Sequence, residues 1–277
     1  MDQADSVIGL FSMLAIAWAL SIDRKAIKWR PVIGGTLVQG RTSFSANVNG
    51  QSNYVSPILH ATLPDGTRAE TLGIRQPSYA VNGNVLVDHA ITRDQVLRIG
   101  FQHGRQRREN VGVGDYNLPD RGFSQRQVGY ALRIAEAGPI GRRMFVNTRL
   151  AFNRSKLDMD SNVNAPAIVV QDMFSSGGAQ RDQHAHLRNL QLASDLDYVR
   201  GIHSWRAGTQ LDTNWFRATS RFNYLGTYTF SDLQAYAGGR PILYTRSIGS
   251  GEVRYRQTRA AVYLQDDIRV RRGLTLS

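Results

Sequence analysis

Two short groups of residues carry side chains that could do chemistry. Asp266 and Asp267 are adjacent carboxylates, a residue type that general acid–base catalysis uses in pairs. Neighbours in a strand point to opposite faces, so these two cannot meet on one substrate. Asp182, His184 and His186 alternate, and two histidines at i and i+2 of an extended chain could hold a metal. No further strong ligand lies near them, so we expect no catalytic residue, no metal, no cofactor and no enzyme.

Arginine supplies most of the charge of this sequence. Lys and Arg number 34 against 22 Asp and Glu, which gives a formal net charge of +12. Such an excess could attract polyanions, either nucleic acid or lipid phosphates. The arginines are instead spread over polar strand faces, so we interpret them as the lining of a wet lumen and expect no nucleic-acid partner. The candidate lumen-facing polar residues are Arg98, Arg133, Arg149, Arg206 and Asp212.

The element that best defines how such residues are positioned is a long hairpin over residues 185–219. Apolar and polar residues alternate at period two on both sides of a turn at 200–203, so one face is apolar. Trp205 and Trp215 share that face, about 33 Å apart along the strand, or roughly 25 Å in height when the strand is tilted. This height matches the apolar band of an outer-membrane barrel, which has aromatic girdles at both edges. The candidate membrane-interface aromatics are Trp205, Trp215, Tyr198 and Tyr263.

From residue 40 onward, long strand patterns alternate with connections that are short and long in turn. This pattern is typical of an up-and-down barrel with short turns at one end and long loops at the other. The alternative, a soluble β-sandwich binding module, has strands nearer 5–6 residues. A short helix is expected at 231–238, with Ser231 as its cap. The predicted fold is mainly β, a partial antiparallel up-and-down transmembrane β-barrel of about eight or nine long strands whose partner is the lipid bilayer.

An apolar run over residues 6–22 precedes these strands and predicts an N-terminal membrane helix. Its length is close to the lower limit for a helix that crosses with ~20 residues. The basic residues Arg24, Lys25, Lys28 and Arg30 follow it and would keep its C-terminal side in the cytoplasm.

The same region resembles the amino terminus of bacterial concentrative nucleoside transporters. The resemblance implies a membrane unit over residues 1–39. It also supplies the alternative function, a fragment of an inner-membrane transporter that couples nucleoside uptake to sodium or protons. The residues that carry it are 14–21, 23–32, 34 and 37–39.

The last arm of the chain carries a second resemblance. The hairpin over residues 261–276 is similar to one in TonB-dependent outer-membrane receptors, and further stretches agree with their Oar-like branch. The motif residues are Tyr263, Gln265, Asp266 and Asp267. The further stretches are 97–98, 108–110, 112–114, 118–121, 133–134, 136–138, 174–180, 193–203 and 230–241.

This second resemblance implies a barrel over residues 40–277 in the bacterial outer membrane. The function implied is transport of large or scarce nutrients, driven by the TonB system through a plug domain. A full receptor barrel needs about 22 strands. We therefore expect a fragment, or a chimera joined near residues 39–40, that does not transport alone, and the sequence identifies no ligand.

Overall fold

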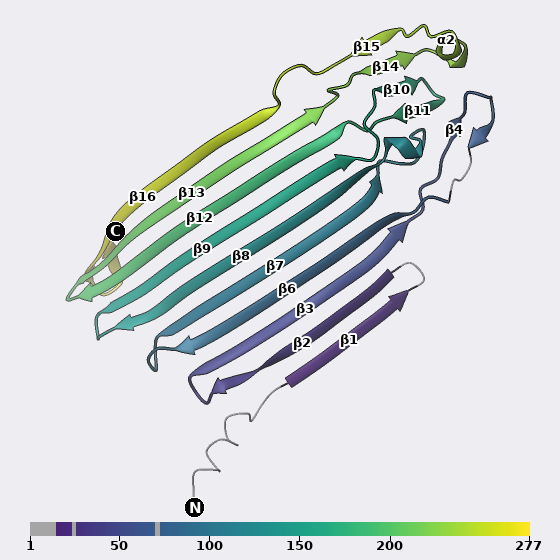
Figure 1. Ribbon diagram of the computed structural model, residues 1–277. Coiled ribbons are helices and arrows are strands. Elements are labelled where there is room, and N and C mark those ends of the chain that lie inside the picture. The colour runs from purple at the N-terminus through teal and green to yellow at the C-terminus, as the bar shows by residue number, and fades with distance from the viewer. Residues whose placement is uncertain (1–14, 24–25, 70–72) are drawn as a thin grey trace, which may run out of the picture.

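The computed structural model describes residues 15–23, 26–69 and 73–277, and most of them form one antiparallel sheet (Figure 1). The sheet has eleven strands in the order β1-β2-β3-β6-β7-β8-β9-β12-β13-β16-β17. Its strands are β1 Ala15–Asp23, β2 Ala26–Val38, β3 Thr42–Val55, β6 Gln76–Ala90, β7 Val96–Val111, β8 Phe123–Ile140, β9 Met144–Ser161, β12 Arg181–Arg200, β13 His203–Phe222, β16 Glu252–Arg271 and β17 Leu274–Leu276. The predicted fold class, a partial up-and-down barrel, is confirmed.

The strands are far longer than those of a soluble sheet. β8 and β9 have 18 residues each, and β12, β13 and β16 have 20 each. A tilted strand needs only about 9–11 residues to cross the hydrocarbon core of a bilayer. Each long strand therefore extends beyond the apolar band, and its outer residues meet a different environment from its middle.

The two ends of the sheet differ, as the alternating connections predict. At one end the hairpins close in short turns, and Gly141 and Gly201 take positive φ values of 66° and 63° there. This left-handed conformation favours glycine because it has no Cβ. At the other end, which we name the loop end, long connections fold on one another above the strands (Figure 1).

The loop end contains the small elements and the buried core. A four-stranded sheet in the order β11-β10-β14-β15 lies beside the β4-β5 hairpin. The core residues are Ala61, Ala69, Val170, Phe174 and Phe230. The small elements are β4 Ala61–Thr62, β5 Arg68–Ala69, η2 Pro119–Arg121, β10 Ala167–Val170, β11 Phe174–Gly177, β14 Thr227–Phe230, α2 Leu233–Ala237 and β15 Leu243–Thr245.

Helix α2 confirms the short helix predicted at 231–238, but a different residue caps it. Asp232 is the N-cap, and its Oδ1 accepts a hydrogen bond of 2.7 Å from the backbone N–H of Ala235. Ser231, the predicted cap, donates its hydroxyl to Asp232 Oδ2 at 2.8 Å. The carboxylate therefore holds the first turn while the serine supports the carboxylate.

The predicted N-terminal helix is wrong where the structure describes it. Ala15–Asp23 is strand β1, and it pairs with β2 along its whole length, from Ala15 opposite Gly34 to Asp23 opposite Ala26. The physical reason is visible in the sequence, where small residues alternate with large apolar ones over positions 15–22 at the period of a strand. Residues 6–14 of the predicted helix lie outside the described residues. Among the described residues, no helix has the length and apolar character to cross a bilayer.

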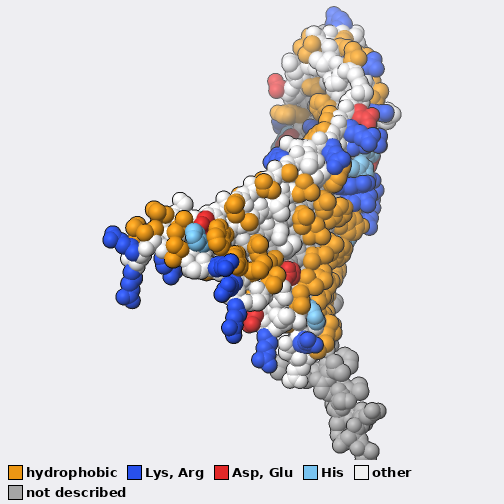
Figure 2. Space-filling view, turned by 90° about the vertical axis from the view of Figure 1, so that its left-hand side faces the viewer, with side chains coloured by type: hydrophobic (Ala, Val, Ile, Leu, Met, Phe, Trp, Pro, Cys, Tyr) orange, Lys and Arg blue, Asp and Glu red, His pale blue; other side chains and the backbone are white. Residues whose placement is uncertain are grey.

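The register divides the main sheet into two faces, because residues directly opposite in an antiparallel pair share a face. One row runs through Ile99, Ile134, Leu150, Leu192 and Leu211, and defines what we name the apolar face. We name the opposite face of the sheet the polar face. Within the described residues no second sheet packs over the apolar face. Figure 2 shows hydrophobic side chains gathered along one side of the molecule.

Candidate functional site

The polar face brings together all the candidate lumen residues, and its arginines are paired. Arg98 Nε lies 2.7 Å from Asp88 Oδ1, and Arg206 Nε lies 2.6 Å from Asp197 Oδ1. Arg149 likewise donates to a carboxylate oxygen of its strand neighbour, Asp195, at 3.0 Å. These arginine side chains are more than half exposed, so solvent screens each pair and the pair adds little to stability. Their main effect is to cancel charge on this face.

The remaining two candidates contact carboxamides. Arg133 Nη1 donates to Gln102 Oε1 at 2.9 Å. Asp212 Oδ1 accepts a hydrogen bond of 2.9 Å from Asn189 Nδ2, and its Oδ2 accepts one of 3.3 Å from Gln191 Nε2. The polar face therefore mixes neutral amides with charge pairs.

One row of the polar face consists almost entirely of carboxamides, and sequence reasoning missed it. We name this row the carboxamide row. Within it, Asn189 donates from Nδ2 to Asn214 Oδ1 at 2.9 Å. Its Oδ1 accepts a hydrogen bond of 3.2 Å from Asn153 Nδ2. Ala131 is the one apolar member. The carboxamides are Asn47, Asn84, Gln102, Asn153, Asn189, Asn214 and Gln257. Eight strands contribute to it, seven of them with a carboxamide, so it emerges only when the register of the sheet is known.

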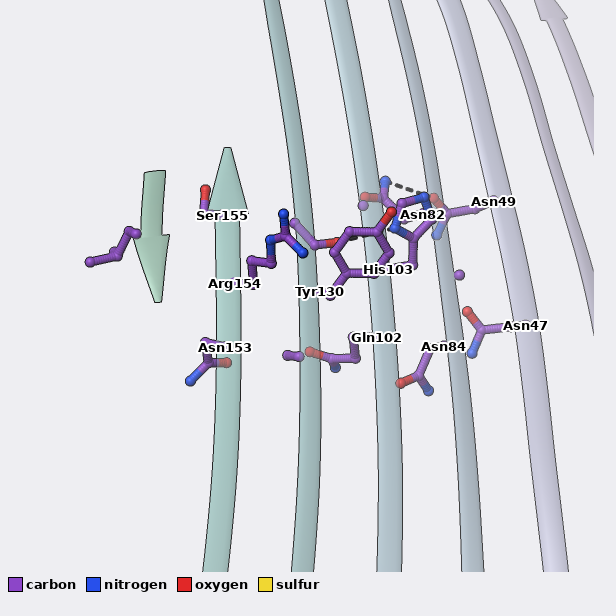
Figure 3. Close-up of a pocket in the computed structure, with 15 residues that line it drawn as sticks. Asn47, Asn49, Asn82, Asn84, Gln102, His103, Tyr130, Asn153, Arg154 and Ser155 are labelled. Atoms are coloured by element: carbon purple, nitrogen blue, oxygen red, sulfur yellow. Dashed lines mark hydrogen bonds between the residues drawn. The ribbon is translucent and has the colours of Figure 1, made fainter. Parts of the chain in front are cut away.

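A hollow of about 500 Å³ lies along part of this row (Figure 3). Gly104 and Gly129 are direct partners on the polar face and lack side chains, which opens the space. Around it, Asn47, Asn84 and Gln102 lie side by side in Figure 3. Carboxamides both donate and accept hydrogen bonds, so the hollow suits polar, uncharged groups. Glycines inside two adjacent strands were the one available signal for it.

Three of the four candidate aromatics lie on the apolar face. Tyr198 and Trp205 are direct partners near the short turns, with rings stacked 5.6 Å apart. Trp215 lies on the same face ten residues further along β13, where Arg256 sits 5.5 Å from its ring centre. The predicted separation of two aromatic levels on one face is therefore present. That these levels mark the membrane edges remains a prediction.

The fourth candidate aromatic, Tyr263, lies on the opposite face from the other three. It pairs with Gly208 on the polar face, and its hydroxyl donates to Asp195 Oδ1 at 2.8 Å. Gly208 makes room for the ring, since a Cβ there would lie 2.2 Å from Tyr263 Cε1. Tyr263 is thus not on the face that carries Trp205, and its prediction as a membrane-interface residue is wrong. Its neighbours Val262 and Leu264 occupy the apolar face instead, with 83% and 76% exposure.

The other motif residues of the last arm divide between the faces. Gln265 and Asp267 share the polar face, and Gln265 Nε2 donates to Asp267 Oδ1 at 3.0 Å. Asp266 is on the apolar face, where it accepts a hydrogen bond of 2.6 Å from His203 Nδ1. The prediction that the two aspartates face opposite ways is confirmed. Asp266 thus links β16 to β13 near their short-turn end, while Asp267 contacts a side chain of its own strand.

The histidine group and the loop motifs have structural partners. His184 Nδ1 contacts Asp158 Oδ1 at 3.0 Å, while Asp182 Oδ1 accepts the backbone N–H of Ser161 at 3.1 Å. Over residues 15–23, 26–69 and 73–277, no three potential ligands gather around a metal position.

The remaining motif stretches join loops that are distant in sequence. Asp120 Oδ2 accepts the backbone N–H of Gly177 at 2.6 Å, and Arg121 donates to the carbonyl of Gly178. Burial lowers the pKa of Arg121, while the adjacent carboxylate of Asp120 opposes that shift. Gln180 bridges to the backbone of Leu225 and Gly226, each at 2.7 Å. These residues therefore shape the loop end and do not form a reactive site.

A single antiparallel wall with an uncovered apolar face, a polar face and long loops at one end defines a transmembrane β-barrel of the outer-membrane type. Residues 82–277 match the family model of the outer membrane beta barrel domain, and the chain belongs to this family. It is a protein of the bacterial outer membrane. The soluble β-sandwich alternative is wrong.

The amino terminus matches a second family model, and solved outer-membrane proteins share the fold. Residues 8–41 match the model of the Na+ dependent nucleoside transporter N-terminus, which confirms the first resemblance. No curated protein matches the chain. The outer membrane transporter YddB of Escherichia coli has 12% identity and a TM-score of 0.56 over 88% of this chain and 32% of its own. A ferric enterobactin receptor mutant (PfeA) of Pseudomonas aeruginosa has 13% identity and a TM-score of 0.50 over 95% of this chain and 37% of its own. The chain thus spans about a third of each, and the likeness is one of fold.

Proposed function

We propose that this chain is part of the wall of a non-enzymatic outer-membrane transport barrel of the TonB-dependent kind. The observation that carries the proposal is the division of one sheet into an uncovered apolar face and a polar face crossed by the carboxamide row. The apolar face would contact lipid and the polar face would line the lumen. The lumen candidates Arg98, Arg133, Arg149, Arg206 and Asp212 would then line the solute path.

The polar face favours polar solutes over charged ones. Three of its candidate arginines, Arg98, Arg149 and Arg206, pair with acids, which reduces the positive charge available to select an anion. The carboxamide row and its hollow supply donors and acceptors without net charge. We infer that solutes rich in hydroxyl or amide groups pass along this wall.

Transport requires more strands than the described sheet contains. Strands β1 and β17 are the edges of the sheet, and open edges are costly in lipid because their backbone groups lack partners. We propose that further strands pair with these edges and that a plug domain links the complete barrel to TonB. The chain alone would then not be competent for energised uptake.

The amino-terminal segment supports a second candidate. The match of residues 8–41 to a nucleoside transporter segment favours a sequence unit over residues 1–39 that differs in kind from the barrel over residues 40–277, although strands β1 and β2 lie in the same sheet as that barrel. A fragment of an inner-membrane nucleoside transporter would locate to a different membrane. Location therefore discriminates between the two functions.

The test is membrane fractionation of the full chain, followed by electrophoresis with and without heating. We expect the chain in the outer-membrane fraction, with migration that changes on heating. In proteoliposome swelling assays with neutral sugars, Asn189→Leu should alter the solute flux of a barrel completed with its missing strands. Retention in the inner membrane would support the nucleoside-transporter reading, and a soluble chain would refute both.

A further inference from the structure

A belt of basic side chains crosses the apolar face near the loop end. The register places Arg105, Lys156, Arg217 and Arg254 in one row, and Arg154, Arg188 and Arg256 in the next row toward the turns. We name the full set the basic belt. It consists of Arg105, Arg107, Arg126, Arg154, Lys156, Arg188, Arg217, Arg254 and Arg256.

The belt corrects the prediction that the arginines are confined to polar strand faces. It lies on the same face as Leu150 and Leu192, beyond the apolar band, because the strands are longer than that band. Figure 2 shows Lys and Arg side chains gathered above the hydrophobic side of the molecule, toward the loop end. The alternation of residues assigns a face, but it does not reveal where along the face lipid gives way to water.

The belt differs from the polar face in how its charge is compensated. Arg107, Lys156 and Arg217 each contact one acid, namely Glu109, Asp158 and Glu252. The other six make no ion pair within the part of the chain that the structure describes. They are Arg105, Arg126, Arg154, Arg188, Arg254 and Arg256.

The position of the belt matches the head-group level of a bilayer. The row of Arg154, Arg188 and Arg256 also contains Tyr130 and Trp215, and aromatic rings of this kind occupy membrane interfaces. The next row toward the turns is largely apolar, with Phe101, Leu132, Phe152 and Leu190. Adjacent strands are about 4.8 Å apart, so six strands from β7 to β16 spread the cations over about 24 Å.

We propose that the basic belt binds the phosphate groups of anionic lipids in the outer leaflet. Charge complementarity is the reason, since six arginines without acidic partners face the level at which lipid phosphates lie. A guanidinium fork matches phosphate geometry in two hydrogen bonds, so each lipid head group could engage arginines of neighbouring strands. A ring of bound lipid would then surround this part of the barrel at a fixed height. This inference uses the lipid contact of the apolar face and is independent of which solute is transported.

The experiment uses the full chain in phosphatidylcholine vesicles, with folding checked by heat-modifiable migration. Brominated phosphatidic acid is then added, and binding is read from quenching of Trp fluorescence against equally brominated phosphatidylcholine. The test variant carries Arg154→Gln, Arg188→Gln and Arg256→Gln. Each basic side chain near an anionic surface is worth about fivefold in binding, so the triple variant should bind phosphatidic acid roughly a hundredfold more weakly.

The matched control removes three arginines from the polar face, Arg98→Gln, Arg133→Gln and Arg149→Gln, and should keep the preference for phosphatidic acid. Replacing the three belt arginines by lysine should restore most of the binding, which guards against a folding defect of the glutamine variant. Added salt should weaken the preference in the native chain.

Three results would overturn the proposal. One is a native chain that is quenched equally by both brominated lipids. Another is an equal loss of binding in the belt variant and in the polar-face control. The third is displacement of phosphatidic acid by inorganic phosphate at similar concentrations, which would define a site for free anions and not for lipid.

Discussion

Replacing Phe174 by Ala tests whether the loop end is a separately stabilised layer. Phe174 is 1% exposed and is the largest fully buried side chain of the described residues. Its ring meets Tyr236 edge to face with centroids 5.4 Å apart, and Tyr236 meets Phe230 in the same way at 5.3 Å. Truncation removes one of the two phenylalanine rings that pack edge to face with Tyr236, and Phe→Ala at such a buried site costs about 3–5 kcal/mol.

That loss acts on the loop end because, among the described residues, this core cluster contains no residue of the main eleven-stranded sheet. Every 1.4 kcal/mol is tenfold in an equilibrium, so we expect the open population of the loop layer to rise at least about a hundredfold. The measure is limited proteolysis of the chain in vesicles, with cleavage sites mapped by mass spectrometry. Cuts should multiply within residues 163–180 and 223–249, while heat-modifiable migration of the wall is retained.

The matched control is Phe101→Ala. Phe101 also lies in a strand, but its side chain is 42% exposed on the apolar face. Lipid chains can fill the space that its truncation leaves there. It should leave cleavage of the loops unchanged. Equal cleavage rates in the two variants, or loss of the folded wall in Phe174→Ala alone, would refute the separation of loop layer and wall.

Three further outcomes follow from the described contacts. Gly177→Ala should open the loop end in the same proteolysis assay by more than about 1 kcal/mol, because φ is +76° and a Cβ would lie 2.0 Å from the carbonyl oxygen of Pro166. Asn189→Leu should lower the free energy of unfolding in urea by about 1–3 kcal/mol, since it leaves Asn214 Oδ1 without its donor and removes one of the hydrogen bonds that Asp212 accepts. The backbone N–H of Ala235, followed by the hydroxyl of Ser231, lowers the pKa of Asp232. Its contribution to α2 is therefore present above the unfolded value of about 3.9 and lost as the pH falls through the lower folded pKa. The Ala235 amide shift in NMR should follow that titration, and Asp232→Ala should abolish it.

Local patterns predicted the strands, whereas the faces of individual residues depended on register. The alternation around Trp205 and Trp215 was sufficient for β12 and β13, because one strand pattern fixes its own two faces. Tyr263 was misassigned because it is out of phase with Val262 and Leu264, the true apolar residues of its strand. An aromatic residue alone does not identify a face, and the phase of its neighbours was the better signal.

The amino-terminal strand and the loop contacts were harder for physical reasons. A short apolar run is ambiguous between helix and strand, and pairing with β2 decides for the strand in Ala15–Asp23. Asp120 and Gly177 lie 57 residues apart, so no local pattern could place them together. The same holds for the carboxamide row, which joins eight strands.

The distribution of buried residues explains why the loop end and the main sheet are stabilised in different ways. The buried apolar side chains, among them Leu59, Val113 and Phe174, lie at the loop end, where water is the solvent and burial needs a protein core. The strands show the reverse, since Phe152 and Leu192 stay 38% and 37% exposed on a face that lipid would cover. Charge is distributed over both faces. On the polar face Arg98, Arg149 and Arg206 pair with acids, while Arg133 donates to the neutral carboxamide of Gln102. On the apolar face the basic belt lies beyond the apolar rows, and six of its nine cations make no ion pair within the described residues, so positive charge is available at the rim of the face that lipid would cover.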